Sequence, residues 1–246
     1  MTIQAIIKNN IKRLLASRGF ALTRVPSMQN YITMQAGLKA IADRKQPLNT
    51  VIDIGASDGR WAAQMMEYYP SCHYLLVEAL ALHEKALKRF CQRHPNAEYV
   101  IAAAGNTLGD IHFDASDPFG GHASYTPFDS SNVVVPMTTI DELVRLKGLE
   151  GPFLVKLDTH GFEVPILEGS TETLKETEAI VIECYNFHIS PESLLFYEMC
   201  AYLKEYGFRC IDLVDPLHRP YDHTFWQMDL IFVRNDRPEF DYTKYK

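Results

Sequence analysis

The chain has 246 residues, of which 47% are hydrophobic and 22% charged, and its 24 basic and 31 acidic side chains give a net charge of −7. This length suits one α/β domain with an extension, and the hydrophobic share is ordinary for a globular protein that buries a core. The acidic balance argues against a nucleic-acid partner, because binding a phosphate backbone requires a basic surface.

The five cysteines indicate neither a disulfide framework nor a zinc site, because their number is odd and no two are spaced as C-x-x-C. We expect reduced thiols packed in the interior, and therefore a cytoplasmic protein. No apolar run approaches the roughly 18 residues that a membrane span requires, so no membrane-spanning segment is predicted.

Residues 1–46 are predicted to form an extension of two helices. In the first, Ile and Leu recur at helical spacing over residues 3–18, and Gly19 is placed to end it. The second is expected over residues 28–44. The first helix is amphipathic, and its basic residues are scattered among apolar ones, unlike those of a signal peptide. Its apolar side favours docking on the protein itself or on a second copy, so a homodimer is one expectation.

From Thr50 onward, short apolar runs alternate with helical segments. Seven runs rich in Val, Ile and Leu are predicted to be strands: 51–56, 74–79, 98–105, 153–161, 179–187, 208–216 and 229–235. Runs of this kind are typical of parallel strands covered by helices on both faces. Four helices are expected between them: 61–69, 82–94, 164–175 and 191–206. This alternation predicts a doubly wound α/β domain over residues 47–246.

The last two strands are separated only by a loop containing prolines, which is too short for a crossover helix. We therefore expect the last strand to be antiparallel. A seven-stranded, mostly parallel sheet with an antiparallel last strand is the Rossmann-like class I methyltransferase fold, and a dinucleotide-binding sheet lacks that strand. Residues 106–150 are predicted to be an insertion with two short strands that acts as a lid or binding element.

The turn after the first strand carries the pattern D-x-G-x-x-x-G, formed by Asp53, Gly55 and Gly59, with Ser57 inside it. Glycines at such a turn let the backbone approach a ligand closely. A dinucleotide site would have a third glycine for the pyrophosphate. Asp53 would repel a pyrophosphate but suits the ammonium group of S-adenosylmethionine, and the acidic Asp58 favours the same cofactor.

Glu78 ends the second predicted strand, 19 residues after Gly59. An acidic residue at this place can accept hydrogen bonds from both ribose hydroxyls of an adenosine ligand. Ala103, near the end of the third strand, is expected beside the adenine. S-adenosylmethionine is therefore the predicted cofactor, and a nicotinamide-dependent oxidoreductase is the alternative that the missing glycine disfavours.

Several segments together resemble the FkbM family of S-adenosylmethionine-dependent methyltransferases. They are VIDIGASDGRW, VEA, VVVPMTTIDEL, FLVKLDTHGFEVPILEGS, AIVIECYNF and FWQMDLIFVRN. The resemblance covers about residues 50–235, and its most specific part is KLDTHGFEVPILEG. It implies O-methylation of a hydroxyl on a sugar, a glycan or a natural product. His160 departs from the glutamate or glutamine common in the family. A protein that keeps this fold for binding without catalysis is a further alternative.

Polar side chains end the fourth and fifth predicted strands, and ligands gather at the carboxyl ends of parallel strands. His160, beside Asp158, is the candidate general base for a hydroxyl acceptor, and His188 is the second choice. Alternatively, Mg²⁺ held by Asp158, Glu183 and Asn186 could orient the hydroxyl and lower its pKa.

Other polar and aromatic residues are interpreted more simply. Glu163 is expected to cap the helix that follows it, in preference to contacting the substrate. Trp226, Tyr125 and Phe119 are candidates for an aromatic wall around the acceptor or for ordinary packing.

Overall fold

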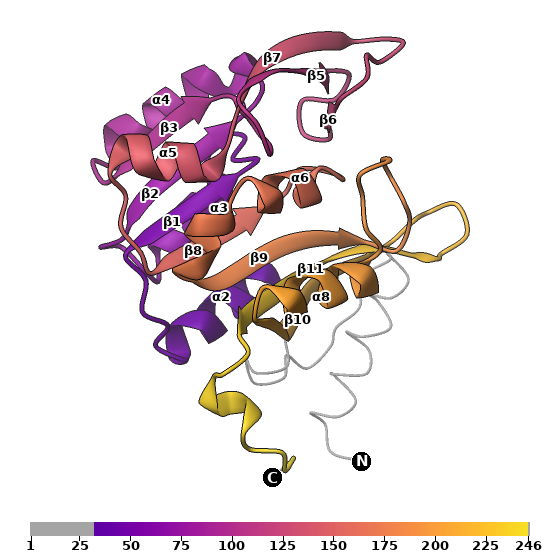
Figure 1. The fold of residues 1–246 in the computed structure, drawn as a ribbon. Helices are drawn as coiled ribbons and strands as arrows, with labels where there is room; N and C mark the ends of the chain where they lie inside the picture. Colours follow the sequence, from indigo (N-terminus) through magenta and orange to yellow (C-terminus); the bar gives the residue numbers. More distant parts are fainter. Residues whose placement is uncertain (1–31, 246) are drawn as a thin grey trace, which may run out of the picture. The chain divides into compact units, whose positions relative to one another are not determined.

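Seven strands form the central sheet, in the order β10–β11–β9–β8–β1–β2–β3 (Figure 1). The computed structural model describes residues 32–245. The strands are β1 (Thr50–Ile54), β2 (His73–Glu78), β3 (Ala97–Ile101), β8 (Phe153–Leu157), β9 (Thr177–Tyr185), β10 (Phe208–His218) and β11 (Phe225–Arg234). Only β11 runs antiparallel to its neighbours, and the other pairs within this sheet are parallel. This topology confirms the predicted class I methyltransferase fold.

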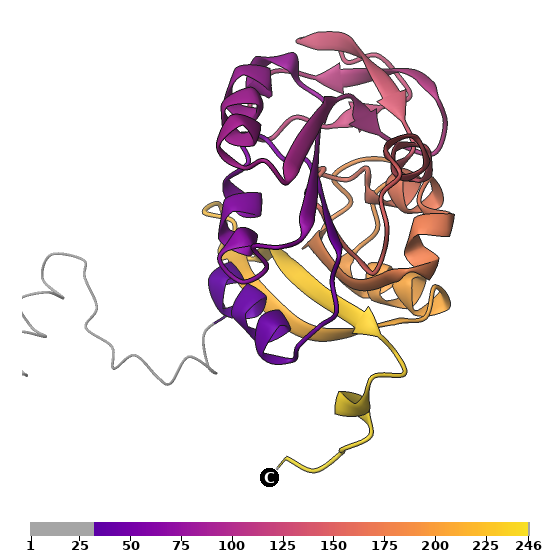
Figure 2. The same cartoon turned by 90° about the vertical axis from the view of Figure 1, so that its left-hand side faces the viewer.

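Helices cover both faces of the sheet (Figure 2). One face packs against α2 (Met34–Asp43), α3 (Arg60–Met66) and α4 (Glu84–Arg93). The other packs against α5 (Ile140–Lys147), α6 (Glu163–Glu168), α7 (Thr171–Lys175) and α8 (Phe196–Glu205). Short 3₁₀ turns lie at η2 (Ala81–His83) and η3 (Pro238–Phe240). Because both faces are covered, strand residues are buried on both sides, which explains the nearly continuous apolar runs.

The N-terminal predictions are only partly within the described residues. The helix predicted over residues 3–18, on which the homodimer expectation rests, lies outside them. The second predicted helix is present as α2, which begins at Met34, and its Leu38 and Ile41 are buried against the sheet. None of the helices in residues 32–245 has the length and apolar character to cross a membrane.

The segment 106–150 differs from the prediction of two short strands. It holds β5 (Gly109–Asp114), β6 (Ala123–Ser124) and β7 (Asn132–Thr138), followed by α5. With β4 (Ala103–Ala104) these strands form a second sheet, in the order β4–β7–β5–β6. The run predicted as one strand over 98–105 is therefore divided, because its last residues leave β2 and pair with β7.

The sequence prediction missed α5, although its capping signals are present. The Thr139 hydroxyl accepts a hydrogen bond from the Glu142 N–H, and Gly148 ends the helix with a φ of 62°. The helix predicted over 164–175 is two helices. The helix is interrupted at Gly169, where a Cβ would lie 2.0 Å from the carbonyl oxygen of Gly105. The helix predicted from residue 191 begins at Phe196.

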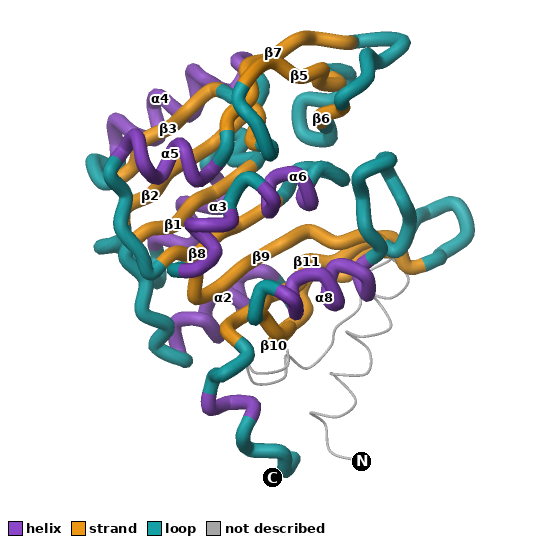
Figure 3. Tube along the Cα trace, in the orientation of Figure 1, coloured by secondary structure: helices purple, strands orange, loops and turns teal. Residues whose placement is uncertain are grey.

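The loop after β9 and the loop between β10 and β11 lie at one end of the central sheet, as Figure 3 shows. The loop between β5 and β6 lies above them. The carboxyl ends of β8 and β9 point to this end, so side chains at these strand ends face the same region as the loops.

Candidate active site

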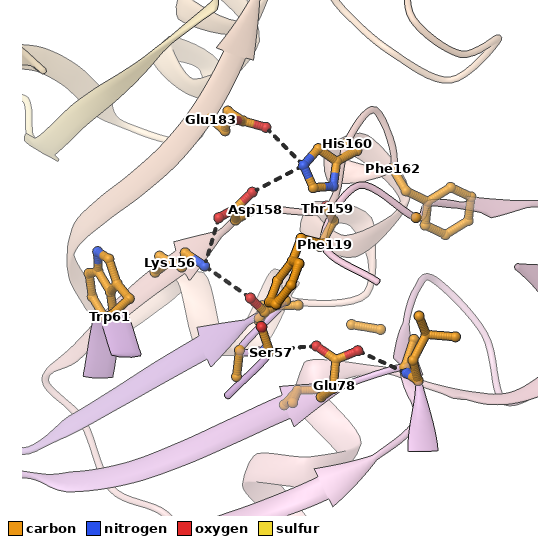
Figure 4. A pocket seen from close by; sticks show the side chains of 18 of the residues that line it. Ser57, Trp61, Glu78, Phe119, Lys156, Asp158, Thr159, His160, Phe162 and Glu183 are labelled. Atoms are coloured by element: carbon orange, nitrogen blue, oxygen red, sulfur yellow. Dashed lines mark hydrogen bonds and ion pairs between the residues drawn. The ribbon is translucent and has the colours of Figure 1, made fainter. Parts of the chain in front are cut away.

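A cavity of about 400 Å³ lies at the carboxyl ends of the central strands (Figure 4). Of the residues predicted to bind the cofactor, four line it: Gly55, Ser57, Glu78 and Ala103. Of the residues predicted for catalysis or metal binding, three line it: Asp158, His160 and Glu183. The segment 106–150 contributes apolar residues to the same cavity, among them Phe113, Phe119 and Ala123.

The turn after β1 contacts the end of β8 directly. Gly55 has a φ of 75°, and a Cβ on it would lie 2.0 Å from the carbonyl oxygen of Asp158. Only glycine fits this contact, because a side chain would meet a backbone atom that cannot move away. Ser57 also has a positive φ, of 50°, and its hydroxyl has no hydrogen-bond partner among residues 32–245.

Glu78 is fixed at the end of β2 by two backbone groups. Its carboxylate accepts hydrogen bonds of 2.8 Å from the N–H of Ser57 and from the N–H of Leu80. The side chain is buried yet lines the cavity. Because each carboxylate oxygen has two lone pairs, both can still accept a hydroxyl hydrogen from a ligand.

Two residues of the predicted cofactor turn do not line the cavity. Gly59 begins α3 with a φ of 83°, and a Cβ there would lie 2.9 Å from the ring of Phe90, so this glycine serves close packing. Asp53 is fully buried in β1, with a carboxylate oxygen 3.2 Å from the Lys156 ammonium. Burial raises the pKa of Asp53, while Lys156 opposes that rise.

Asp53 was expected to contact the cofactor, but its carboxylate is instead in contact with the ammonium of Lys156. Its ammonium also donates a 3.1 Å hydrogen bond to the carbonyl of Gly55 and lies 3.2 Å from Asp158. Asp58 does not line the cavity either, and its carboxylate pairs with the guanidinium of Arg60 at 2.7 Å. The nearby acidic residues of the turn thus have protein partners of their own.

Three carboxylates lie side by side on adjacent strand ends. Asp158 follows β8, and the register of β8 with β9 places it next to Glu183. Glu183 is directly opposite Asp229 of β11, so these two side chains project from the same face of the sheet. Burial and the neighbouring Asp158 raise the pKa of Glu183 to about 9 and that of Asp229 to about 7. Burial acts against ionisation of Asp158 too, but Lys156 and His160 hold its pKa below the ordinary value.

His160 lies between two of these carboxylates. Its Nε2 atom is 3.6 Å from Asp158 and 3.6 Å from Glu183 (Figure 4). Its backbone has a φ of 53°, an uncommon conformation for a residue other than glycine. The histidine is thus held beside the cavity by a strained loop.

Glu163 holds that loop in place. It is the first residue of α6 and is buried, and its carboxylate accepts hydrogen bonds from the Gly161 N–H at 3.0 Å and the Thr159 N–H at 3.3 Å. Glu163 was expected to cap the helix that follows it. Its carboxylate instead binds the backbone of the two residues on either side of His160.

Two predicted candidates point elsewhere. The Asn186 side chain donates to the carbonyl of Phe225 at 3.2 Å, and His188 Nδ1 lies 3.0 Å from the carbonyl of Ser193. Neither lines the cavity. Within residues 32–245, the side chains grouped closely enough to hold a metal ion are Asp158, His160 and Glu183, with ligand atoms within 4.8 Å of one another. His160 thus takes the place that the predicted magnesium site gave to Asn186.

The aromatic candidates lie in different surroundings. Phe119 lines the cavity and is covered by the guanidinium of Arg60 at 5.1 Å. Tyr125 packs on Phe162, which lines the cavity, with ring centroids 5.3 Å apart. Trp226 stacks on Phe187 outside the lining. Of these three candidates, only Phe119 is therefore available to touch a ligand in the cavity.

The cavity also contains residues that were not assigned to the site from the sequence, among them Met34, Trp61, Gln64 and Asp215. They come from α2, α3 and β10, and only the packing of these elements brings them together. A signal was available for Lys156, because it precedes Asp158 by two residues in a strand and so shares its face.

Two comparisons with known sequences each match part of the chain. Residues 53–210 match the family model described as the methyltransferase FkbM domain. Over 80 residues the chain is 26% identical to the hexuronic acid methyltransferase AglP of Haloferax volcanii. The match covers 32% of this chain and 33% of that protein, so the chain spans about one third of the length of this curated relative.

Solved structures resemble the chain more weakly. The fibrillarin pre-rRNA processing protein of Methanococcus jannaschii has a TM-score of 0.49 at 12% identity, over 81% of this chain and 75% of that one. The 1,6-didemethyltoxoflavin-N1-methyltransferase of Burkholderia thailandensis has a TM-score of 0.44 at 12% identity, over 95% and 89%. Neither likeness bears on function, and the fold assignment rests on the strand order and pairing.

Proposed function

Since this chain belongs to the methyltransferase FkbM domain family, we propose that it transfers the methyl group of S-adenosylmethionine to a hydroxyl of a sugar, a glycan or a natural product. The FkbM family match makes methyl transfer the function class, and a nicotinamide-dependent oxidoreductase has no comparable support. The sugar-directed name of AglP supports a sugar or glycan acceptor.

The cofactor half of the proposal rests on the turn after β1 and on Glu78. The ribose hydroxyls bind the Glu78 carboxylate, which two backbone N–H groups already orient. Ala103 would contact the adenine, and Gly55, Lys156 and Asp158, which line the same cavity, would surround the methionine part. Asp53 acts indirectly, by holding the Lys156 ammonium at 3.2 Å.

The observation that carries the reaction type is His160, set between Asp158 and Glu183 at the cavity. The acceptor oxygen attacks the methyl carbon in line with the carbon–sulfur bond. That bond breaks, its electron pair stays on the sulfur of S-adenosylhomocysteine, and the hydroxyl proton passes to His160 Nε2. Asp158 stabilises the imidazolium that forms.

A divalent cation is a second candidate for activating the hydroxyl. Asp158, His160 and Glu183 would hold it, because their ligand atoms lie within 4.8 Å of one another. One nitrogen and two oxygen donors suit manganese, iron or zinc better than magnesium. Lys156, 3.2 Å from Asp158, weighs against it, because its positive charge occupies the same carboxylate.

Binding and turnover test the proposal together. Calorimetry should show that S-adenosylhomocysteine binds, and Glu78→Ala should weaken it by about tenfold or more, because the ribose loses its acceptor. Glu67→Gln, on an exposed side chain of the same unit, is the matched control. No binding at millimolar concentration would refute the cofactor assignment. Binding without label transfer from methyl-labelled cofactor to any hydroxylated acceptor would favour a protein that binds without catalysis.

Chelation separates the two ways of activating the hydroxyl. With His160 as base, turnover should be unchanged after dialysis against EDTA. Loss of turnover that manganese restores would favour the cation.

A further inference from the structure

The cavity continues beyond the cofactor residues toward β11 and β10. We call this part the acceptor lobe and define it by Met34, Trp61, Gln64, Glu183, Asp215 and Asp229, all of which line the cavity. Glu78 ends β2 and Gly55 follows β1, on one side of β8 in the sheet. On the other side lie Glu183 of β9, Asp229 of β11 and Asp215 of β10. The three carboxyl groups of the acceptor lobe therefore lie on the far side of Asp158 from the cofactor turn, whereas Trp61 and Gln64 come from α3, which follows that turn.

Carboxyl groups dominate this lobe. Asp158, Glu183 and Asp229 form a row across three adjacent strands, and Asp215 of β10 lies beyond it. Among the described lining residues Lys156 is the cation of this region, and Asp53 and Asp158 already share it. Arg60 also lines the cavity, but its guanidinium pairs with Asp58 and covers Phe119 of the lid.

The protein compensates the members of this row unequally. Glu183 accepts hydrogen bonds from the Tyr185 hydroxyl and the Gln227 amide. The Asp229 side chain is half-buried and has no hydrogen bond or ion pair with any residue of the described chain. Burial and the neighbouring Asp158 favour the protonated forms of Glu183 and Asp229 in the free protein. A ligand that brings a positive charge to this row favours the ionised carboxylates instead.

A second, independent feature of the lobe indicates a ligand. Trp61 is 8% exposed and lines the same cavity, and its indole N–H has no acceptor among residues 32–245. A buried donor without a partner costs free energy unless something else accepts its hydrogen bond. The ring of Trp61 already faces a cation, because the Lys156 ammonium lies 5.9 Å from its centroid. Its indole N–H is therefore the unused donor that the cavity offers to an oxygen of the acceptor, in addition to the carboxyl group of Asp229.

We propose that the acceptor carries a protonated amine near its reacting hydroxyl, as an amino sugar does, and that Asp229 binds this amine. The inference rests on the proposed function and deepens it. The sulfonium of the cofactor supplies one positive charge beside Asp158, and the acceptor supplies a second beside Asp229. A hexuronic acid would instead bring its carboxylate against the acidic row, so the acceptor differs in charge from the one in the name of AglP.

Three acceptors on one ring test the charge preference: glucosamine, glucose and glucuronate, each titrated into the complex with S-adenosylhomocysteine. We expect glucosamine to bind on the order of tenfold more tightly than glucose, and glucuronate to bind more weakly still. Failure of glucosamine to bind, or binding of glucuronate at least as tight, would overturn the proposal.

Variants locate the preference. Asp229→Asn should bring the affinities for glucosamine and glucose together, while the affinity for S-adenosylhomocysteine stays unchanged. Asp222→Asn, at the exposed hairpin between β10 and β11, should leave the preference intact. An unchanged preference in Asp229→Asn would assign the amine to another group and overturn its placement. If S-adenosylhomocysteine itself fails to bind, the proposed function fails; if it binds and the charge preference is absent, only this inference does.

Discussion

Gly55 and Asp158 are in contact through their backbones, so close that a Cβ on Gly55 would lie 2.0 Å from the Asp158 carbonyl oxygen. This contact joins the turn after β1, where the cofactor is proposed to bind, to the end of β8, where the chemistry is proposed to occur. The distance between the two halves of the site is therefore set by backbone packing. Side-chain changes in either half alter its charge but not this spacing.

The first prediction concerns Gly55→Ala. The added methyl meets a backbone oxygen, and the φ of 75° is itself unfavourable for alanine. We expect S-adenosylhomocysteine affinity in calorimetry to fall by more than about tenfold. Gly148→Ala is the matched control, because Gly148 also has a positive φ but a Cβ there meets nothing within 4 Å. That control should lower the free energy of unfolding by only about 1 kcal/mol and keep cofactor affinity. Equal cofactor binding in both variants would contradict the contact.

The second prediction concerns His160→Ala. If His160 takes the acceptor proton, kcat should fall by about 100- to 10,000-fold while the Kd for S-adenosylhomocysteine stays unchanged. His188→Ala provides the contrast, since His188 lies outside the cavity and contacts Ser193. Single-turnover kinetics with labelled cofactor measure the rate of methyl transfer in both variants. A normal rate in His160→Ala would show that His160 is not the general base, and Asp229 or a bound cation would then be the candidates for activating the hydroxyl.

The third prediction concerns Glu163→Gln. The amide has the same size, but whichever way it is turned its NH₂ group faces the Gly161 N–H, because both carboxylate oxygens accept from that N–H. We expect the loop that carries His160 to lose its fixed geometry, so kcat should fall by about tenfold with little change in KM for the cofactor. Glu172→Gln, on exposed α7, should leave both unchanged. A fall in cofactor affinity alone would indicate a different role for Glu163.

The fourth prediction concerns pH. Burial and the nearby Asp158 raise the pKa of Glu183 to about 9 and that of Asp229 to about 7, so the folded protein holds protons on these groups that the unfolded chain releases at lower pH. Their stabilising contribution is complete below the unfolded pKa values and is lost as pH rises through about 7 and 9. Without ligand, the free energy of unfolding in urea should therefore decline from pH 5 to pH 9.

Variants show which carboxyl group causes this decline. Glu183→Gln should reduce the slope of the free energy of unfolding against pH by at most about 1.4 kcal/mol per pH unit, because the variant no longer binds that proton in the folded state. Glu172→Gln should retain the full slope. Stability that rises between pH 7 and pH 9 would show that these carboxylates are ionised in the folded protein.

Local sequence patterns determined much of the outcome. Alternating apolar runs and helices predicted the doubly wound sheet, because strands covered on both faces need apolar residues throughout. The short loop before β11 predicted its antiparallel direction, since a parallel connection needs a crossover. The D-x-G turn and Glu78 also lie where the sequence placed them, because a glycine turn and an acidic strand end are features of only a few consecutive residues.

Only the tertiary structure decided which side chains share the cavity. Asp53 and Gly59 belong to the cofactor turn in sequence, yet one holds Lys156 and the other packs on Phe90. Asn186 follows the right strand but points to Phe225, whereas Asp229, which the antiparallel direction of the last strand predicts at this edge, does line the cavity. Neighbours across a sheet depend on strand order and register, which contacts between distant segments establish. Spacing along the chain therefore identified the turn that is proposed to bind the cofactor, and the pairing of β9 with β11 assembled the carboxylate row.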